Sequence, residues 1–284
     1  MKINLISRDN GAGLSTDMHL LGDMFRAEGH DVEFVDWRSK HMRRCEVGIF
    51  LELLNPRLLI SMERSVGVFN MEWFMGSWVR HLHRLGQLWA KGSEAYEIFD
   101  KLGHGKKTTL TGFLSRDAYD ASIPRKMQAF HLKGHSDLKG TEHVLEAWRN
   151  NPDLPRLTIV SNDPVDAPAG VEVLHDISNR DLFRLMNESL IHVCPSRSEG
   201  WGHYITEGLS VGGIVITTDA SPMNEQVREE WGVLLKPDSS SMHGLAAASD
   251  VSPEGIASAA RWIAGLDQDA IEERSRLARR HVLD

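Results

Sequence analysis

The stretch Pro195–Val227, PSRSEGWGHYITEGLSVGGIVITTDASPMNEQV, decides the fold that this sequence predicts. Two carboxylates, Glu199 and Glu207, lie eight residues apart within it. The first falls in a Gly-rich turn at 199–202, the second falls where a helical pattern begins, and a buried-strand pattern follows at 213–218. This order predicts an α/β unit with acidic groups at the carboxyl ends of strands, where open α/β sheets bind ligands.

Strand and helix patterns alternate along the rest of the chain. The first half opens with an apolar strand at 2–7, a Gly-rich loop, a helix and a second strand at 31–36. An irregular stretch at 114–126 contains Pro124, and a new strand starts at 127. We therefore expect two Rossmann-like α/β domains with mostly parallel sheets and a cleft between them. The expected boundaries are 1–114 for the first domain, 115–126 for a linker, and 127–284 for a second domain that ends in two helices.

Composition excludes several classes of protein. The 284 residues are 41% hydrophobic and 25% charged, which are ordinary globular values. No apolar run approaches the roughly 18 residues of a membrane span, and the N-terminus has no signal-peptide layout. Cys45 and Cys194 are far apart in apolar surroundings, which predicts buried thiols and a cytoplasmic protein. The 14 histidines show no metal-ligand spacing, so we predict no metal site.

Two features of the first half are candidate ligand contacts. The loop Gly11-Ala12-Gly13 precedes a helix, and its glycines allow backbone amides to approach an anion or a sugar. Thr16 stands where a dinucleotide fingerprint has its third glycine, which disfavours NAD and leaves a purely structural turn as the alternative. Glu72 follows directly on a predicted strand. A ligand contact and an ion pair with an arginine both remain open for it.

Two lysines mark the start of the second half. Lys133 and Lys139 flank a loop between a predicted strand and a predicted helix. Alone, two such lysines are ordinary surface charges. A nucleoside diphosphate that leaves without a metal ion needs cations and backbone amides to neutralise its charge. With Glu199 and Glu207 downstream, we therefore interpret the lysines as a diphosphate site.

These motifs resemble family 4 of the retaining glycosyltransferases, which carry an E-x7-E motif. The segment 199–202 with Glu207 matches the family's E-G-F-G-x-x-x-x-E, with Trp201 in place of phenylalanine. Leu138-Lys139-Gly140 matches a Lys-Gly before the first helix, and 28–32 resembles R-G-H-x-V. Lys133 stands where the family more often has arginine, which is a departure from the family's pattern. Lysine is a point charge and lacks the planar guanidinium fork of arginine.

The resemblance implies a GT-B architecture and a role for each matched residue. Glu199, Lys133 and Lys139 would be catalytic, with Glu199 at the hydroxyls of the transferred sugar and the lysines at the diphosphate. Glu207 would accept hydrogen bonds from the ribose hydroxyls, because one carboxylate can accept two from a vicinal diol. The other implied donor-binding residues are Gly200, Trp201, Gly202, His203, Tyr204, Thr206 and Ser161, and Gly11, Ala12, Gly13 and Glu72 are assigned to the acceptor or sugar side.

The predicted function is that of a hexosyltransferase-like enzyme. It would move a sugar from a nucleoside diphosphate sugar to a hydroxyl with retention, without metal or cofactor, and with the leaving diphosphate as base. A UDP-sugar is the favoured donor and a GDP-sugar the second candidate. A saccharide, lipid or small-molecule acceptor is favoured over a modified DNA base, because the net charge is −8. The alternatives are a sugar-nucleotide epimerase of the same architecture and a transferase-like protein that binds a sugar or nucleotide without catalysis.

Overall fold

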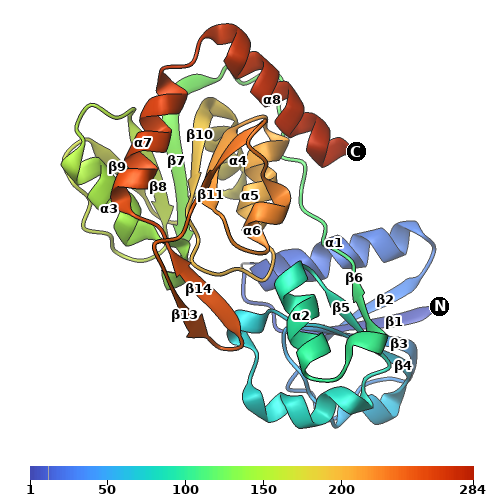
Figure 1. The fold of residues 1–284 in the computed structure, drawn as a ribbon. Coiled ribbons are helices and arrows are strands. Elements are labelled where there is room, and N and C mark those ends of the chain that lie inside the picture. The colour runs from blue at the N-terminus through green and yellow to red at the C-terminus, as the bar shows by residue number, and fades with distance from the viewer. Residues whose placement is uncertain (12) are drawn as a thin grey trace. The chain divides into compact units, whose positions relative to one another are not determined.

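The computed structural model describes residues 1–11 and 13–284 of the chain (Figure 1). The described residues form two compact units. The first comprises Met1–Ser115 with Met242–Ala246, and the second comprises Arg116–Ser241 with Ala247–Asp284. The domain boundaries expected from the sequence, 1–114 and 127–284 with a linker at 115–126, remain a prediction. Each unit is built around one six-stranded parallel sheet, which confirms the expected α/β fold.

The first unit has the strand order β2-β1-β3-β4-β5-β6. Its central strands alternate between two apolar layers, as a sheet covered on both faces requires. Ile3 and Leu5 of β1 pack with α1, whereas Ile6 packs on the opposite side with α2 and the 3₁₀ helices. The elements are β1 (Lys2–Ser7), α1 (Gly13–Ala27), β2 (Asp31–Asp36), β3 (Cys45–Leu51), η1 (Leu58–Ser61), β4 (Met62–Val68), η2 (Met71–Trp73), η3 (Gly76–Arg84), β5 (Gln87–Ala90), α2 (Ser93–Lys101), η4 (Gly105–Lys107) and β6 (Thr108–Leu110).

The second unit has the strand order β12-β11-β10-β7-β8-β9. The elements of its sheet layer and its helices are β7 (Lys126–Gly134), η5 (Asp137–Lys139), α3 (Thr141–Asn150), β8 (Leu157–Ser161), β9 (Val171–Leu174), α4 (Asn179–Glu188), β10 (Ser189–Cys194), α5 (His203–Ser210), β11 (Ile214–Thr218), α6 (Met223–Gln226), β12 (Gly232–Leu235), α7 (Pro253–Ala264) and α8 (Gln268–Leu283). Helices α3 and α7 pack on one face of this sheet, while α4, α5 and α8 pack on the other.

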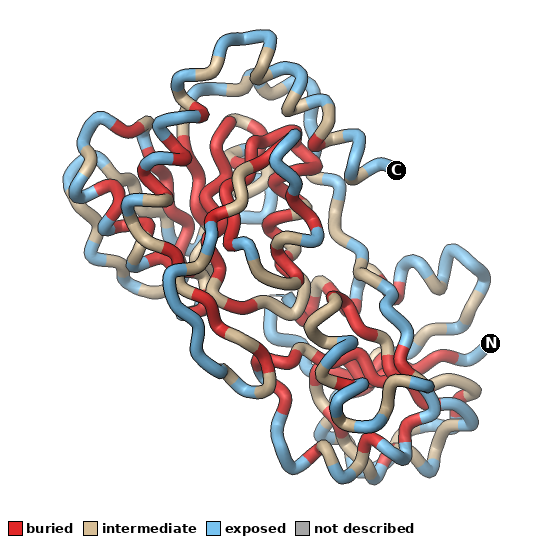
Figure 2. The backbone as a smooth tube through the Cα atoms, viewed as in Figure 1, coloured by how far each residue is buried: buried red, intermediate tan, exposed pale blue. Residues whose placement is uncertain are grey.

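Buried residues run along strands of both sheets (Figure 2). Every residue of β10 is buried, and its side chains alternate between the two layers. Ile191 and Val193 pack toward α3 and α7, whereas Cys194 packs toward α5. Cys45 and Cys194 are both buried free thiols, as the sequence predicted.

A two-stranded sheet in the last part of the chain was not expected from the sequence. Strands β13 (Ser239–His243) and β14 (Ala246–Asp250) form a separate two-stranded sheet. The segment 239–243, SSSMH, lacks the apolar alternation that predicts a strand, and most of it is exposed. Its neighbour Ala246 is buried in the core of the first unit, and Leu245 donates a backbone hydrogen bond to Met71 O at 2.9 Å. Pairing and packing, rather than propensity, account for this element.

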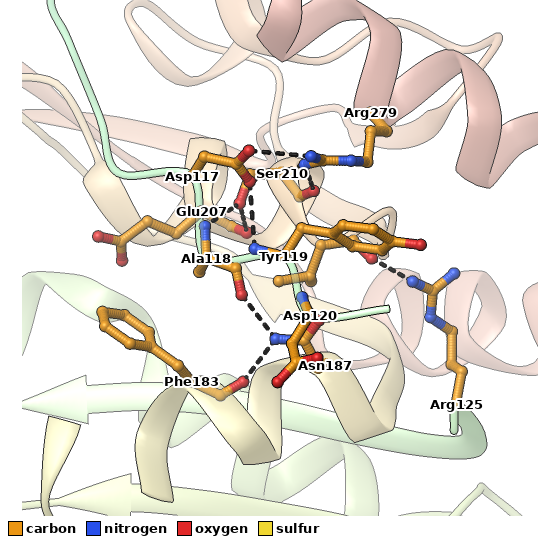
Figure 3. A network of polar contacts seen from close by, with 11 residues as sticks. Asp117, Ala118, Tyr119, Asp120, Arg125, Phe183, Asn187, Glu207, Ser210 and Arg279 are labelled. Carbon is orange, nitrogen blue, oxygen red and sulfur yellow. Dashed lines mark hydrogen bonds and ion pairs between the residues drawn. The ribbon is translucent and has the colours of Figure 1, made fainter. Parts of the chain in front are cut away.

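The segment after Ser115 is held tightly on the second unit (Figure 3). Arg279 of α8 forms a two-pronged ion pair with Asp117, with N–O distances of 2.7 and 2.9 Å. Asn187 of α4 donates to Ala118 O at 2.7 Å and accepts from the Asp120 N–H at 2.9 Å. Hydrogen bonds of the Arg279 guanidinium lower the pKa of Asp117, with a further contribution from the Tyr119 amide. These contacts attach residues 117–120 to helices on one face of the second sheet.

Two buried histidines make the second unit sensitive to acid. Burial lowers the pKa of both His131 and His192 to about 4. His131 Nδ1 donates to Val193 O at 2.7 Å, so Nε2 accepts from the Thr141 hydroxyl at 2.8 Å and the ring is neutral. Unfolded histidine binds a proton below about pH 6.5, whereas these folded rings do not until about pH 4. The free energy of unfolding therefore falls as the pH drops from 6.5 toward 4.

The His192→Gln variant tests the dependence of the free energy of unfolding on histidine protonation. His192 lies inside β10 and not at its carboxyl end. Between pH 7 and pH 5, one such histidine should remove about 2 kcal/mol from the free energy of unfolding. The variant should therefore lose about 2 kcal/mol less than the wild type over this interval, measured by urea denaturation at both pH values. His41→Gln, at an exposed position, is the control and should keep the wild-type difference. Equal losses in wild type and His192→Gln would contradict the prediction.

Candidate functional site

The carboxyl ends of β7 and β10 lie side by side at the centre of the second sheet. From this point the chain order runs outward in opposite directions, to β8 and β9 on one side and to β11 and β12 on the other. Such a reversal opens a crevice at the strand ends, where α/β proteins bind ligands. Lys133 lies at the end of β7, and the segment 195–202 follows β10.

A close backbone approach joins the loops after these two strands. Gly140 has a φ of 68°, and a Cβ atom placed on it would lie 2.2 Å from Pro195 O. Only glycine fits both the left-handed backbone and this distance. The Arg197 N–H donates to Leu138 O at 2.7 Å across the same junction. The two loops are therefore in direct contact, which brings Lys139 to the segment after β10.

Lys139 and Glu199 form the closest ion pair of the site. Lys139 Nζ lies 2.5 Å from Glu199 Oε1, and both side chains are mostly buried, at 16% and 14% exposed. The Ser196 hydroxyl donates to the same carboxylate oxygen at 2.5 Å and lies 2.6 Å from the Tyr204 hydroxyl. Lys139 Nζ also lies 3.9 Å from the centre of the Tyr204 ring. Serine, tyrosine and lysine together fix the orientation of the Glu199 carboxylate.

Lys133 makes a separate set of contacts in the site. Its Nζ atom lies 3.1 Å from Asp163 Oδ2 and 3.9 Å from Asp137 Oδ1. Hydrogen bonds from Lys133 and His135 lower the pKa of Asp163. Ser161, at the end of β8, donates to Asp163 O at 2.7 Å. Lys133 and Ser161 therefore share Asp163 as a partner, and this aspartate was not predicted from the sequence.

Helix α5 carries the second carboxylate of the motif. Gly202 precedes the helix with a φ of 91°, a left-handed conformation that favours glycine. Glu207 is buried, and burial raises the pKa of its carboxyl group, while attraction to His203, Arg116 and Lys139 acts in the opposite direction. The Glu207 side chain points away from the Asp117–Arg279 pair (Figure 3). A buried carboxylate in a positive surrounding is suited to accept hydrogen bonds from a diol.

The remaining predicted donor residues hold the loop before α5 in place. The Thr206 hydroxyl donates to the Gln226 side chain, and the Gln226 amide donates to Trp201 O. His203 and Tyr204 are the first two residues of α5, so their backbone amides lie in its first turn. Gly200 and Trp201 lie in the loop itself. Gln226 links these residues and was not predicted from the sequence.

The residues assigned to the acceptor or sugar side belong to the first unit. Ala12 lies outside the described residues. The Gly11 N–H donates to Asp9 Oδ1 at 3.2 Å and to Ser15 Oγ at 2.8 Å, so this loop is closed by its own side chains. Gly13 is the first residue of α1, and Glu72 is buried in η2. Their role toward a ligand remains a prediction.

Sequence comparison identifies the region that carries the paired carboxylates. Residues 165–251 match the family described as glycosyl transferases group 1. The match covers less than half of the chain. The matched range includes Glu199 and Glu207, while Lys133 and Lys139 precede it. No curated protein matches the sequence. The enzyme class, glycosyltransferase, rests on this family match.

Comparison with solved structures shows that the whole chain has the GT-B fold. A glycosyltransferase from Rickettsia africae is 12% identical, with a TM-score of 0.75 over 99% of this chain and 93% of that one. HepE from Anabaena, in complex with UDP and glucose, is 13% identical, with a TM-score of 0.71 over 99% and 94%. Sucrose-phosphate synthase from Thermosynechococcus elongatus gives the same values, 13%, 0.71, 99% and 94%. These likenesses establish the fold of the whole chain.

Two further properties concern the described residues, 1–11 and 13–284. None of their helices is both long enough and apolar enough to cross a membrane. Within the same residues, histidine, cysteine, aspartate and glutamate side chains form no group of three that could hold a metal ion.

Proposed function

We propose that the chain is a retaining glycosyltransferase that transfers a sugar from a UDP-sugar to a hydroxyl group. The observation that carries this proposal is the contact between Lys139 and Glu199 at the centre of the second sheet. It sets a cation for phosphate beside a carboxylate for sugar hydroxyls. A UDP-sugar is favoured over a GDP-sugar because the similarly folded HepE forms complexes with UDP, glucose and UDP-glucose.

In this proposal each charged residue has one task. Lys133 and Lys139 neutralise the diphosphate, Glu199 accepts hydrogen bonds from the transferred sugar, and Glu207 accepts them from the ribose. Gly200, Trp201, Gly202, Thr206 and Ser161 shape the donor site, and the first-turn amides of His203 and Tyr204 donate to the donor's oxygens. Gly11, Ala12, Gly13 and Glu72 are proposed for the acceptor or sugar side.

The reaction that we propose has one bond made and one broken. The bond from the anomeric carbon to the diphosphate oxygen breaks, and a bond to the acceptor oxygen forms on the same face. The acceptor proton passes to the leaving diphosphate. The side chains supply position and positive charge, without a metal ion or a cofactor. We place the reaction in the cytoplasm, because the two cysteines are buried free thiols, with a saccharide, lipid or small molecule as acceptor and a modified DNA base less favoured.

A thermal-shift panel tests the donor and the absence of a metal requirement. UDP, GDP, ADP and TDP and their common sugars are added with EDTA present. A ligand at 100 times its Kd should stabilise the folded chain by about 2.7 kcal/mol, or about 5–10 °C for a chain of this size. We expect the largest shift with a UDP-sugar and its loss in Glu207→Ala. The absence of a shift with every nucleotide would contradict the proposal.

A further inference from the structure

A pocket opens on the outer side of the 3₁₀ helices of the first unit. It lies between η3 and η1 with the residues just before it, and its volume is about 520 Å³. The lining residues, all from the first unit, are Asn55, Pro56, Arg57, Ile60, His81 and Arg84. The same two helices direct Leu58, Trp78 and Leu82 into the core on one face of the first sheet. The pocket therefore lies on their solvent side.

The pocket is positively charged, and its two arginines are unpaired. Arg57 and Arg84 are exposed, and neither forms an ion pair in the part of the chain that the structure describes. No described aspartate or glutamate lines the pocket. Burial lowers the pKa of His81, and so does repulsion from Arg80, Arg84 and His83. Positive charges are thus close together here, and an anion would meet hydrogen-bond donors without repulsion.

The segments around the pocket extend this positive charge. The stretches 37–45, 53–62 and 73–93 contain no aspartate or glutamate. Asn55 Nδ2 donates to two carbonyl oxygens of the first stretch, at 2.7 and 3.2 Å, which holds this stretch against the second. The exposed cations of the three stretches are Arg38, Lys40, Arg43, Arg44, Arg57, Arg80 and Arg84. A run of cations alone is usually a solvated face, so a further observation has to identify a partner.

That observation is Ile60, which lines the pocket together with the two arginines. It is 81% exposed, the highest value for a large apolar side chain among the described residues, whereas Leu58 in the same helix is 1% exposed. A phosphate beside an acyl chain would match both the arginines and the isoleucine. A nucleic-acid backbone would pair with the arginines and leave Ile60 in water. The combination therefore favours an anionic lipid.

We propose that this pocket binds the phosphate of an anionic lipid and docks the first unit on the surface of a bilayer. Arg57 and Arg84 donate to the phosphate oxygens, in the charge-assisted geometry that a guanidinium group offers to phosphate. Ile60 enters the boundary between headgroups and acyl chains, and the cations at 38–44 lie at the level of the headgroups. The inference does not depend on the donor or the acceptor of the proposed sugar transfer.

Sedimentation of the full chain with lipid vesicles tests the inference. We expect binding to vesicles of phosphatidylcholine mixed with phosphatidylglycerol and none to phosphatidylcholine alone. Arg57→Gln and Arg84→Gln should each lower the partition coefficient about fivefold, the usual contribution of one basic residue near an anionic bilayer. Ile60→Ser should lower it about tenfold, because the burial of an isoleucine side chain is lost. Added salt should weaken the binding of the wild type.

Arg64→Gln is the matched control, since it removes the same charge from the opposite face of the first sheet. Arg64 is exposed and alternates along β4 with Val66 and Val68, which pack in the cluster on the α1 side. It should keep the wild-type partition coefficient. The thermal unfolding midpoint of each variant is measured beside the wild type, to show that all of them are folded.

Three results would overturn the inference. The first is a wild type that does not sediment with the anionic vesicles, and the second is an equal loss in Arg64→Gln and Arg57→Gln. The third is binding to soluble glycerol phosphate or to duplex DNA that needs Arg57 and Arg84 but not Ile60, since the pocket would then serve a soluble phosphate or a nucleic acid. The thermal-shift panel with nucleotide sugars decides the proposed function separately, because it uses no lipid.

Discussion

Replacing Lys139 by alanine should lower the turnover of the nucleotide sugar about a hundredfold, the usual effect of removing one group that stabilises developing charge. The ammonium group lies 2.5 Å from Glu199 and 3.9 Å from the centre of the Tyr204 ring, so it is fixed before a donor binds. A fixed cation at a leaving diphosphate needs no reorganisation during the reaction. The measurement is the initial rate of UDP release at saturating donor.

The Glu199→Gln variant should lose turnover by a similar factor. In the double variant Lys139→Ala/Glu199→Gln, turnover should fall by less than the product of the two single factors. This non-additivity is expected because each residue holds the other in place. Lys126→Ala is the control, since Lys126 begins the same strand, β7, and pairs with Glu188 on the surface at 2.7 Å. Wild-type turnover in Lys139→Ala would remove this lysine from the mechanism.

The sequence placed Lys139 and Glu199 at one edge of the second sheet, because the signals for this placement are local. Lys139 and Glu199 are far apart in the chain, but both follow predicted strands, and the carboxyl ends of parallel strands share one edge of a sheet. The predicted strand positions were accurate enough to place both residues there. Tyr204 and Ser196 were harder, because nothing in a sequence pattern shows that their hydroxyls are 2.6 Å apart.

The sequence did not place Glu52 and Lys91 at the carboxyl edge of the first sheet, because the ends of strands are hard to predict. The apolar patterns at 47–53 and 88–91 by themselves predict strands that would contain Glu52 and Lys91. The structure ends β3 at Leu51 and β5 at Ala90, so both residues lie just beyond the sheet. An error of one or two residues at a strand end decides whether a polar side chain is assigned to the strand or to the loop at its carboxyl end, where α/β sheets bind ligands.

Backbone conformation is a second property that sequence patterns did not reveal. Glu52 has a left-handed φ of 63°, whereas its residue type favours a right-handed or extended backbone. The Glu52 side chain is buried and accepts a hydrogen bond from Asn70, and such contacts between residues distant in sequence are not visible in a local pattern. At Gly140 the residue type itself permits the left-handed φ of 68°, because glycine has no Cβ atom.

Replacing Gly140 by alanine should destabilise the chain by about 2–3 kcal/mol and lower turnover tenfold or more. The alanine Cβ would lie 2.2 Å from Pro195 O, and the left-handed φ of 68° adds strain of its own. The loops after β7 and β10 would have to separate, which would move Lys139 away from Glu199. A misplacement of about 1 Å at a catalytic group can cost a hundredfold in rate.

Gly170→Ala separates these two causes, because Gly170 has a φ of 87° but no atom within 4 Å of the added Cβ. Its expected cost is the strain alone, about 1 kcal/mol, without a change in turnover. Urea denaturation and UDP release are measured for both variants. If Gly140→Ala behaves like Gly170→Ala, contact with Pro195 does not hold the site together, and the Lys139–Glu199 pair must be maintained by Ser196 and Tyr204. If it loses both stability and turnover, the close approach of the two loops is what positions the charges.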